Sequence, residues 1–386
     1  MMLFAVLVTC LIAVIVVTGL FVSFRNNNIY IRDYATLLDM IDRLYIGEYE
    51  EDYITAIAMK AAVESLYDGW SYYLTPAEFA YFMDDTSNQY VGIGVNVVVD
   101  EATGGIGIDF VHPDSPADEA GIVAGDVIIA IDGQDITAEE AEDARVLLYR
   151  EIGETVELTI LHEDGSTGSF TIVFAYVFLD PISFEMLSYD TSDIGYIRIR
   201  DFDDGAAGGF IPAAFDLVDQ GACALIIDVR YNGGGRVTEM TDILDFLLPQ
   251  GEIFIEVDKN GMEFITESDP EMLDIPCVVL VDQNSYSAAE YFAATLSEYD
   301  YAIIVGEQTT GKSRVQSTFK MPGGGALHIS TSNYLTRNRV DLHNAGGLTP
   351  DYQIVLTDEE YDLLMANKLD KDADPQLAKA LELLAS

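Results

Sequence analysis

The chain has few basic residues for its length. Its 386 residues include 19 Lys and Arg against 66 Asp and Glu, which gives a formal net charge of −47 at pH 7. This charge would repel both the phosphates of nucleic acid and an anionic membrane surface. We therefore expect no nucleic-acid partner, and we interpret the acidic residues as a solvated surface that favours solubility.

Cysteine and histidine are also scarce, with 3 and 4 residues respectively. Cys10 lies in an N-terminal apolar run, while Cys223 and Cys277 begin predicted buried strands, where small buried thiols are usual. This count excludes a disulfide framework. No Cys/His cluster has the spacing of a metal site, so the sequence predicts neither a metal nor another cofactor.

A basic segment and a small-residue cleavage site are both missing around the long apolar run Leu3–Phe24. A cleaved signal peptide needs both of them. As a helix, the run would span about 33 Å, which is enough for a bilayer core. We therefore expect residues 1–25 to form an uncleaved, single-pass membrane anchor. Arg25 and Arg32 follow the run, and the positive-inside rule alone would keep the later residues in the cytoplasm.

Residues 26–88 are predicted to be helical. Residues 34–41 and 54–63 carry apolar faces at helical spacing, and Thr75 with Pro76 has the pattern of a capped helix start. No ionisable group in this region is placed to suggest chemistry. We expect the region to connect, to pack or to dimerise.

Residues 89–176 form short predicted strands that Gly, Asp and Pro separate. The runs Ser115–Ile122 and Gly125–Gly133, with Tyr90–Val95 upstream, closely resemble a PDZ domain; the alternative is a small β-domain with ordinary turns. The resemblance implies that backbone N–H groups bind a peptide's terminal carboxylate while the peptide adds a strand to the sheet. The predicted peptide-binding residues are Tyr90, Val91, Gly92, Ile93, Gly94 and Val95.

Residues 177–356 alternate between predicted strands and helices, which indicates an α/β domain. Between a strand at 224–229 and a helix at 237–248 lies a run of three glycines, Gly233–Gly235. Such a turn leaves its backbone N–H groups unshielded. It could cradle a phosphate, although Lys and Ser/Thr at P-loop spacing are absent, or it could form an oxyanion hole. The tail at 357–386 is predicted to be helical and acidic.

Ser287 is the candidate nucleophile. It follows the apolar strand Cys277–Val281 and a short turn, and a predicted helix begins directly after it. At such a turn the hydroxyl can be exposed, and the N-terminus of the helix stabilises negative charge nearby.

A serine needs a base to take its proton. His112 and His162 fall in the PDZ-like domain, whereas His328 and His343 remain open as spatial neighbours. Lys312 is the other option, since it follows a turn that could present it to the serine. Its pKa must then fall from about 10.4 toward neutrality, so we expect Lys312 to be buried among apolar side chains without a carboxylate partner.

Gln316 lies four positions after Lys312, which places both side chains on one face of a strand or of a helix. An amide there can orient an amine without adding charge. Arg314 would share that face in a strand, where it could assist as a cation or simply be exposed.

Together these motifs resemble the carboxyl-terminal processing peptidases, which are serine proteases of family S41. The resemblance rests on residues 66–76, the PDZ-like domain, Asp228–Gly235, Ser285–Glu290, Val305–Lys312 and Gly347–Asp351, in the order of the family. It implies an α+β and α/β multidomain chain whose crotonase-like protease core covers 177–356. It also implies a Ser–Lys dyad of Ser287 and Lys312 with an assisting Gln316, and an oxyanion hole formed by Gly233, Gly234 and Ala288.

The departures from the family pattern are modest. Gly233 stands where proline is usual, and Tyr286 and Ala289 replace small residues or serine. Ser313 and Arg314 also differ from the usual residues. None of these changes removes a required group.

The resemblance implies an endopeptidase that cleaves polypeptides near free, apolar C-termini, which the PDZ domain would capture. Family members commonly act outside the cytoplasmic membrane, so we expect extracytoplasmic catalytic domains despite the weak arginine signal. The helices at both ends suggest a homodimer. Two alternatives remain: a catalytically silent PDZ scaffold, in which Ser287 only caps a helix, and a serine-dependent esterase or crotonase-like acyl-transfer enzyme.

Overall fold

The computed structural model describes residues 29–100, 103–136, 144–365 and 368–385. The chain divides after Ala62 into two compact units. In the first unit, α2 (Ile29–Leu44) has no buried residue, and α3 (Glu51–Glu64) extends just past the division. The predicted anchor at 1–25 lies outside the described residues. Among the residues described, no helix is long and apolar enough to cross a membrane.

The second unit begins with a short strand and a capped helix. Strand β1 (Tyr72–Leu74) leads to α4 (Pro76–Thr86). Thr75 and Glu78 form a reciprocal capping box at the start of α4, with Pro76 in the first turn, as the sequence predicts.

The next segment forms a small antiparallel sheet in the order β3-β4-β5-β7-β8, with β6 paired to β5, and a separate β2–β9 pair. Ile106, Ile128, Leu158 and Ile160 contribute to a core of their own. A helix is predicted at 139–149, partly outside the described residues; the structure has the 3-10 helix η1 (Arg145–Leu148) there. The elements are β2 (Gln89–Gly92), β3 (Val95–Val99), β4 (Ile106–Val111), α5 (Pro116–Glu119), β5 (Val127–Ile131), β6 (Gln134–Asp135), β7 (Thr155–Leu161), β8 (Thr167–Val173) and β9 (Ala175–Phe178).

The main sheet has the strand order β10-β11-β12-β15-β16-β19. All neighbouring strands are parallel except β10 and β11. Because side chains alternate along a strand, β12 sends Leu225 and Ile227 to one face and Ala224 and Ile226 to the other. The strands are β10 (Ile182–Tyr189), β11 (Ser192–Ile199), β12 (Ala224–Asp228), β15 (Cys277–Val281), β16 (Ala302–Gly306) and β19 (Tyr352–Gln353).

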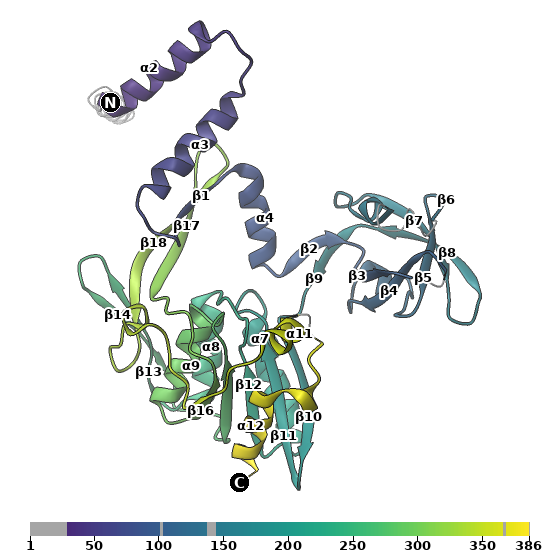
Figure 1. The fold of residues 1–386 in the computed structure, drawn as a ribbon, viewed down its shortest axis with the longest axis vertical. Coiled ribbons are helices and arrows are strands. Elements are labelled where there is room, and N and C mark those ends of the chain that lie inside the picture. The colour runs from purple at the N-terminus through teal and green to yellow at the C-terminus, as the bar shows by residue number, and fades with distance from the viewer. Residues whose placement is uncertain (1–28, 101–102, 137–143, 366–367, 386) are drawn as a thin grey trace, which may run out of the picture. The chain divides into compact units, whose positions relative to one another are not determined.

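Helices cover both faces of this sheet, so its strands are apolar on both sides (Figure 1). On one face lie α7 (Ala206–Asp219), α8 (Val237–Leu247) and α9 (Ala288–Glu298). On the other face α12 (Pro375–Leu384) packs through Leu377 and Ala380. The remaining helices are α10 (Leu342–Ala345), α11 (Asp358–Met365) and the 3-10 helix η2 (Lys371–Ala373).

A second sheet borders the main one, in the order β1-β18-β13-β14 with β17 also paired to β18. The sequence predicts a strand at 326–330, and β18 runs five residues further, to Leu335. Strand β1 pairs with β18 through Tyr72 and His328, so the region before the PDZ-like domain belongs to this sheet. The other strands are β13 (Gly251–Asp258), β14 (Glu263–Ser268), β17 (Arg314–Lys320) and β18 (Ala326–Leu335).

A buried ion cluster joins α12 to the main sheet. The Arg230 guanidinium donates to Asp228 at 2.6 and 3.0 Å and to Asp374 at 2.7 Å. Asp374 also caps the N-terminus of α12. Since Asp228 and Arg230 flank the start of the glycine turn, this cluster holds one end of the turn in place.

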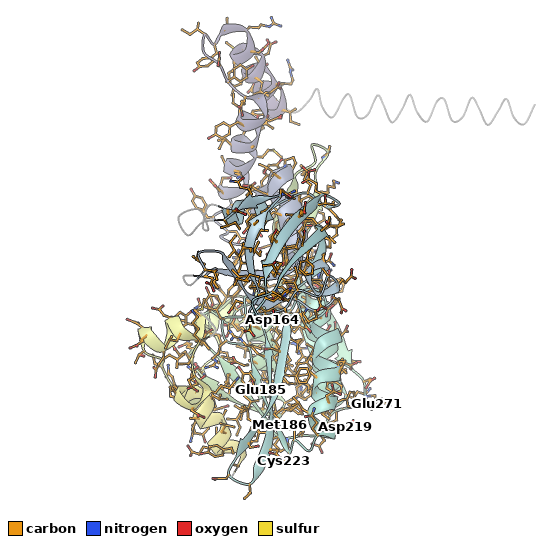
Figure 2. All side chains as sticks on the ribbon, turned by 90° about the vertical axis from the view of Figure 1, so that its right-hand side faces the viewer. Asp164, Glu185, Met186, Asp219, Cys223 and Glu271 are labelled. Carbon is orange, nitrogen blue, oxygen red and sulfur yellow. The ribbon has the colours of Figure 1, made fainter. Side chains whose placement is uncertain are left out.

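The two described cysteines differ in burial. Cys277 is buried at the start of β15, as predicted, and both thiols are free. Cys223, however, is exposed in the turn before β12, near the lower end of the view in Figure 2, so its predicted burial is wrong. The strand begins one residue later, at Ala224.

Candidate active site

Ser287 stands at the N-cap of α9, directly after the turn that follows β15. Its φ of 59° and ψ of −123° lie outside the regions that a non-glycine residue usually adopts. This strained backbone points the side chain into a cavity of about 580 Å³. The helix N-terminus lies beside the hydroxyl, as the sequence predicts.

Ser285, two residues earlier, is fully buried and has a different task. Its hydroxyl donates to the Val229 carbonyl at 2.7 Å and accepts from the Asp282 N–H at 3.0 Å. The Asp282 carboxylate accepts the N–H of Tyr231 at 2.9 Å. Burial raises the pKa of Asp282, against the hydrogen bonds that lower it. Asp282 and Ser285 thus tie the serine turn to the glycine turn.

The glycine turn lies against Ser287. A Cβ on Gly234 would come within 2.7 Å of the Ser287 Cβ and 3.0 Å of the Ala288 nitrogen, and its φ is +98°. Two of the three predicted oxyanion donors, Gly234 and Ala288, therefore lie beside the serine. The Gly234 N–H, however, donates to the Asn232 side chain at 2.8 Å, so it is not the free amide that the sequence predicts.

Lys312 is buried, with 8% of its surface exposed. Its ammonium lies 4.3 Å from the centre of the Trp70 ring and 5.8 Å from that of Tyr286. Burial lowers the pKa of Lys312 to about 8, although the charges of Asp68 and Glu290 act in the opposite direction. The burial that the sequence leads us to expect for this lysine is present, and the Trp70 and Tyr286 rings contribute to it.

Both of these carboxylates are engaged elsewhere. Glu290 accepts the backbone N–H groups of Gly311 at 2.7 Å and Lys312 at 2.9 Å, and it also accepts the Thr309 hydroxyl. Asp68 pairs with Arg314 at 2.8 Å. Burial raises the pKa of Glu290, and its hydrogen bonds oppose this. The carboxylate of Glu290 therefore holds the lysine loop by its backbone and leaves the amine to the cavity.

Gln316 lines the same cavity as Ser287 and Lys312. Lys312 precedes β17, and a register shift separates Val315 from Gln316, so the two side chains do not share one regular strand. The Gln316 amide donates to the Arg314 carbonyl at 3.0 Å and the Ser330 hydroxyl at 3.2 Å. These bonds orient the amide, and its action on the amine stays a prediction.

The two histidines left open by the sequence both lie near the Lys312 loop. His328 lines the cavity and contacts the Thr318 hydroxyl at 2.8 Å, and burial, with the charge of Lys312, lowers its pKa to about 4. His343 contacts the Gly311 carbonyl at 3.1 Å, at the back of the lysine loop. His328 is thus the histidine that shares the cavity with Ser287.

The cavity also contains Tyr334, which the sequence reasoning missed. Its hydroxyl donates to the Lys312 carbonyl. Burial and then the charge of Glu290 raise the pKa of Tyr334 above its ordinary value, and a hydrogen bond with Ser287 opposes them. Tyr334 therefore connects the serine to the lysine loop.

The six residues predicted to bind peptide come together in one small groove, Tyr90–Val95. Val97, Leu148 and Tyr149 complete its lining. No group of three or more His, Cys, Asp or Glu residues in the described part of the chain is arranged to hold a metal ion.

The comparison with known proteins agrees with this geometry. The model of peptidase family S41 matches residues 193–354, and that of the PDZ domain matches residues 107–161. The chain is 30% identical over 319 residues to the carboxyl-terminal-processing protease of Picosynechococcus sp., covering 82% of this chain and 76% of that protein. The chain belongs to the carboxyl-terminal processing peptidases of family S41.

Two further relatives agree with this assignment. The carboxyl-terminal-processing protease of Synechocystis sp. is 29% identical over 333 residues, which is 86% of this chain and 77% of that protein. The solved structure of a photosystem II D1 C-terminal processing protease is 25% identical, with a TM-score of 0.51, over 92% of this chain and 94% of that one. This S41 member is therefore a serine-type peptidase that acts on polypeptides, which decides against the silent scaffold and the esterase.

The sequence reasoning missed several residues of the site in this S41 peptidase. Glu290 falls inside the serine motif, and the available signal was a carboxylate among the apolar residues of the predicted helix. Asp68 and Trp70 belong to the region where no ionisable group is placed to suggest chemistry, yet Asp68 pairs with Arg314 near Lys312, and the Trp70 ring lies 4.3 Å from the Lys312 amine. Nothing in the local sequence marks Tyr334.

Proposed function

We propose that this peptidase hydrolyses peptide bonds with Ser287 as the nucleophile and Lys312 as its base. The observation that carries the proposal is the burial of Lys312 between two aromatic rings, in the cavity into which Ser287 points. In a chain with a net charge of −47, an exposed lysine would stay protonated. Enclosure supplies the neutral amine that the serine needs.

Lys312 is a better base here than His328. The pKa of Lys312 is lowered to about 8 and that of His328 to about 4. A base works best when its pKa lies near the operating pH. A difference of about four pKa units makes proton transfer to His328 less favourable by roughly 5 kcal/mol.

The proposed reaction proceeds by acyl transfer. The Ser287 oxygen attacks the carbonyl carbon of the scissile bond while its proton moves to the Lys312 amine. The C–N bond then breaks, and the ammonium returns the proton to the leaving amine. Water attacks the acyl-enzyme by the same route and releases the new C-terminus. Gln316 would orient the amine through its amide.

The oxyanion would be held by backbone N–H groups of Gly233, Gly234 and Ala288. The close approach of Gly234 to Ser287 and to the Ala288 nitrogen supports this proposal. Since the Gly234 N–H donates to Asn232, it becomes a donor to substrate only by sharing or breaking that bond.

The pH dependence of cleavage tests the assignment of the base. Because the neutral amine is the active form, kcat/KM should rise with pH through about 8 and reach a plateau above it. The measurement is the rate of hydrolysis of a peptide without titrating side chains from about pH 3 to about pH 10. A profile with an ascending limb near 4 would instead assign the proton transfer to His328.

We propose that the groove of Tyr90–Val95 binds the substrate's C-terminus. The gathering of these residues in one groove supports it, as does the apolar lining by Val97 and Leu148. Backbone N–H groups of such a loop bind a carboxylate, and the groove accepts an apolar terminal side chain.

Amidation of the substrate's C-terminus should therefore weaken binding. Charge-assisted hydrogen bonds are lost, so we expect KM to rise by roughly tenfold while kcat changes little. The measurement compares one peptide with a free and an amidated C-terminus. Equal KM values would mean that this groove does not select the terminus.

We also propose a single-pass membrane anchor at 1–25, with the catalytic domains outside the cytoplasm, and a homodimer. The uninterrupted apolar run supports the anchor. Protease accessibility in sealed, right-side-out vesicles tests the topology, and a protected catalytic domain would overturn that proposal.

For the dimer, α2 exposes Tyr34, Leu37 and Leu44, whose three- and seven-residue steps form an apolar stripe. Light scattering tests the dimer, and a monomer would overturn it.

A further inference from the structure

The segment Asp68–Ser71 is anchored to the second sheet beside the lysine. The Ser71 hydroxyl donates to the Asp68 carboxylate at 2.6 Å and accepts the Ser330 N–H at 3.0 Å. Asp68 also accepts the Trp70 N–H at 3.2 Å and pairs with Arg314 at 2.8 Å. Strand β1 continues directly from this segment and pairs with β18. The segment is therefore held at both ends.

This anchoring places Trp70 over the amine of Lys312. The Nζ atom lies 4.3 Å from the centre of the Trp70 ring, within the range of a cation–π contact. The Tyr286 ring lies 5.8 Å from the same Nζ and 5.5 Å from the Trp70 ring. Tyr286 precedes Ser287, so one wall of this enclosure comes from the serine turn and the other from the Asp68–Ser71 segment.

We propose that Trp70 is a positioning residue of the reaction: its indole, together with the Tyr286 ring, covers the Lys312 amine, holds it in place and keeps water away from it. This inference rests on the proposed role of Lys312 as the base. It gives a task to the region before the PDZ domain, which folds into the wall of the active site.

Arg314 makes this arrangement compatible with a neutral lysine. The charge of Asp68 raises the pKa of Lys312, as does that of Glu290. Asp68 forms an ion pair with Arg314, which offsets part of its charge, and Glu290 is bound to backbone N–H groups. The Asp68–Ser71 segment is thus anchored through the Asp68 carboxylate, and the Arg314 guanidinium beside it offsets part of that charge.

Two effects of the indole act on the amine in opposite directions. Its face attracts the ammonium and favours the protonated form, whereas its exclusion of water disfavours that form. Burial is the largest influence on the pKa of Lys312 and lowers it to about 8. We therefore expect exclusion of water to be the dominant effect of Trp70.

Trp70 is the single tryptophan of the chain, so its fluorescence reports on the amine without any catalysis. In the full chain carrying Ser287→Ala, the emission should change with pH around a midpoint of about 8. In the same chain carrying Lys312→Met as well, that transition should vanish. A transition that persists without the lysine, or none in either protein, would overturn the contact. The titratable and charged groups around the amine are Asp68, Tyr286, Glu290, Arg314, His328 and Tyr334.

The effect on catalysis is tested by Trp70→Ala in the otherwise wild-type chain. Water then reaches the amine, so the ascending limb of kcat/KM should move upward from about 8 toward the ordinary lysine value. At pH 7 the rate should fall roughly tenfold or more and should recover as the pH is raised. Trp70→Phe keeps a ring over the amine and should keep the limb near its wild-type position.

Tyr67→Ala is the matched control, since Tyr67 lies near Trp70 in the chain but its side chain is 97% exposed. It should leave the limb unchanged. The inference would be overturned if the ascending limb of kcat/KM in Trp70→Ala stays at the wild-type pH or moves to lower pH. Failure of the proposed base gives a different result, because Lys312→Met would then retain activity whatever Trp70 does. If Trp70→Ala does not fold, the fluorescence titration of the Ser287→Ala chain still decides.

Discussion

Ser287→Ala is expected to abolish cleavage of an unfolded protein that ends in an apolar residue. The nucleophile is lost while the cavity and the helix stay in place, so kcat should fall by a factor of at least about 10⁴. Lys312→Met should produce a loss of similar size, because the two side chains act as one unit. The double variant should be hardly slower than either single one.

The stability of Lys312→Met provides a control for this loss. The folded protein lowers the pKa of Lys312 from 10.5 to about 8, so below pH 8 the buried ammonium disfavours folding. Unfolded chains bind more protons between these two values, and wild-type stability should therefore rise with pH across that window. At pH 7, Lys312→Met should be more stable than wild type by on the order of 3 kcal/mol, an advantage that disappears toward pH 10.5. Activity lost together with stability would instead indicate misfolding.

Ser285→Ala separates the two serines of the motif. The buried Ser285 hydroxyl bonds to the Val229 carbonyl and the Asp282 N–H. Its removal should lower stability by about 1–2 kcal/mol, measured by denaturant unfolding, and should leave detectable cleavage. If Ser285→Ala lost all activity in a folded protein while Ser287→Ala retained it, the assignment of the nucleophile would be wrong.

Gly234→Ala should have the second-largest effect. The added Cβ would lie 2.7 Å from the Ser287 Cβ and 3.0 Å from the Ala288 nitrogen, and φ at this position is +98°. The serine and the amide beside it must therefore shift. Because small displacements of reacting groups weaken catalysis strongly, kcat/KM should fall by roughly 10²-fold or more. Steady-state kinetics on a peptide substrate measure this loss.

Gly208→Ala serves as the matched control for the glycine substitution. Gly208 lies in α7, and a Cβ there would meet nothing within 4 Å. Since alanine favours a helix over glycine, the variant should keep full activity and gain up to about 1 kcal/mol in stability. Equal losses in Gly208→Ala and Gly234→Ala would argue against a special role for Gly234.

Much of the site could be predicted because its parts lie in short, continuous runs. An apolar strand, a turn and a helix start are local patterns, and they placed Ser287 at the N-cap of α9. The glycine run between a strand and a helix marked the turn that meets the serine. The requirement that Lys312 be buried followed from chemistry alone, since a lysine in an acidic chain is otherwise protonated.

The tertiary structure decided which groups enclose these parts. Trp70 reaches Lys312 through the pairing of β1 with β18, whose residues are distant in the chain, and Tyr334 reaches it through the pairing of β17 with β18. Local periodicity carries no information about such contacts. It also could not show that Asn232 occupies the Gly234 N–H, because that depends on a side-chain rotamer.

Sequence by itself therefore determined the nucleophile turn, the glycine turn, the candidate base and the resemblance to family S41, all of which local order encodes. Only the folded chain decided how the proposed base is enclosed. The enclosure excludes water from one amine, and the groups that do so, Trp70 and Tyr286, come from segments more than two hundred residues apart in the sequence. Desolvation of the Lys312 amine depends on all the side chains around it, and these come from separate segments of the chain.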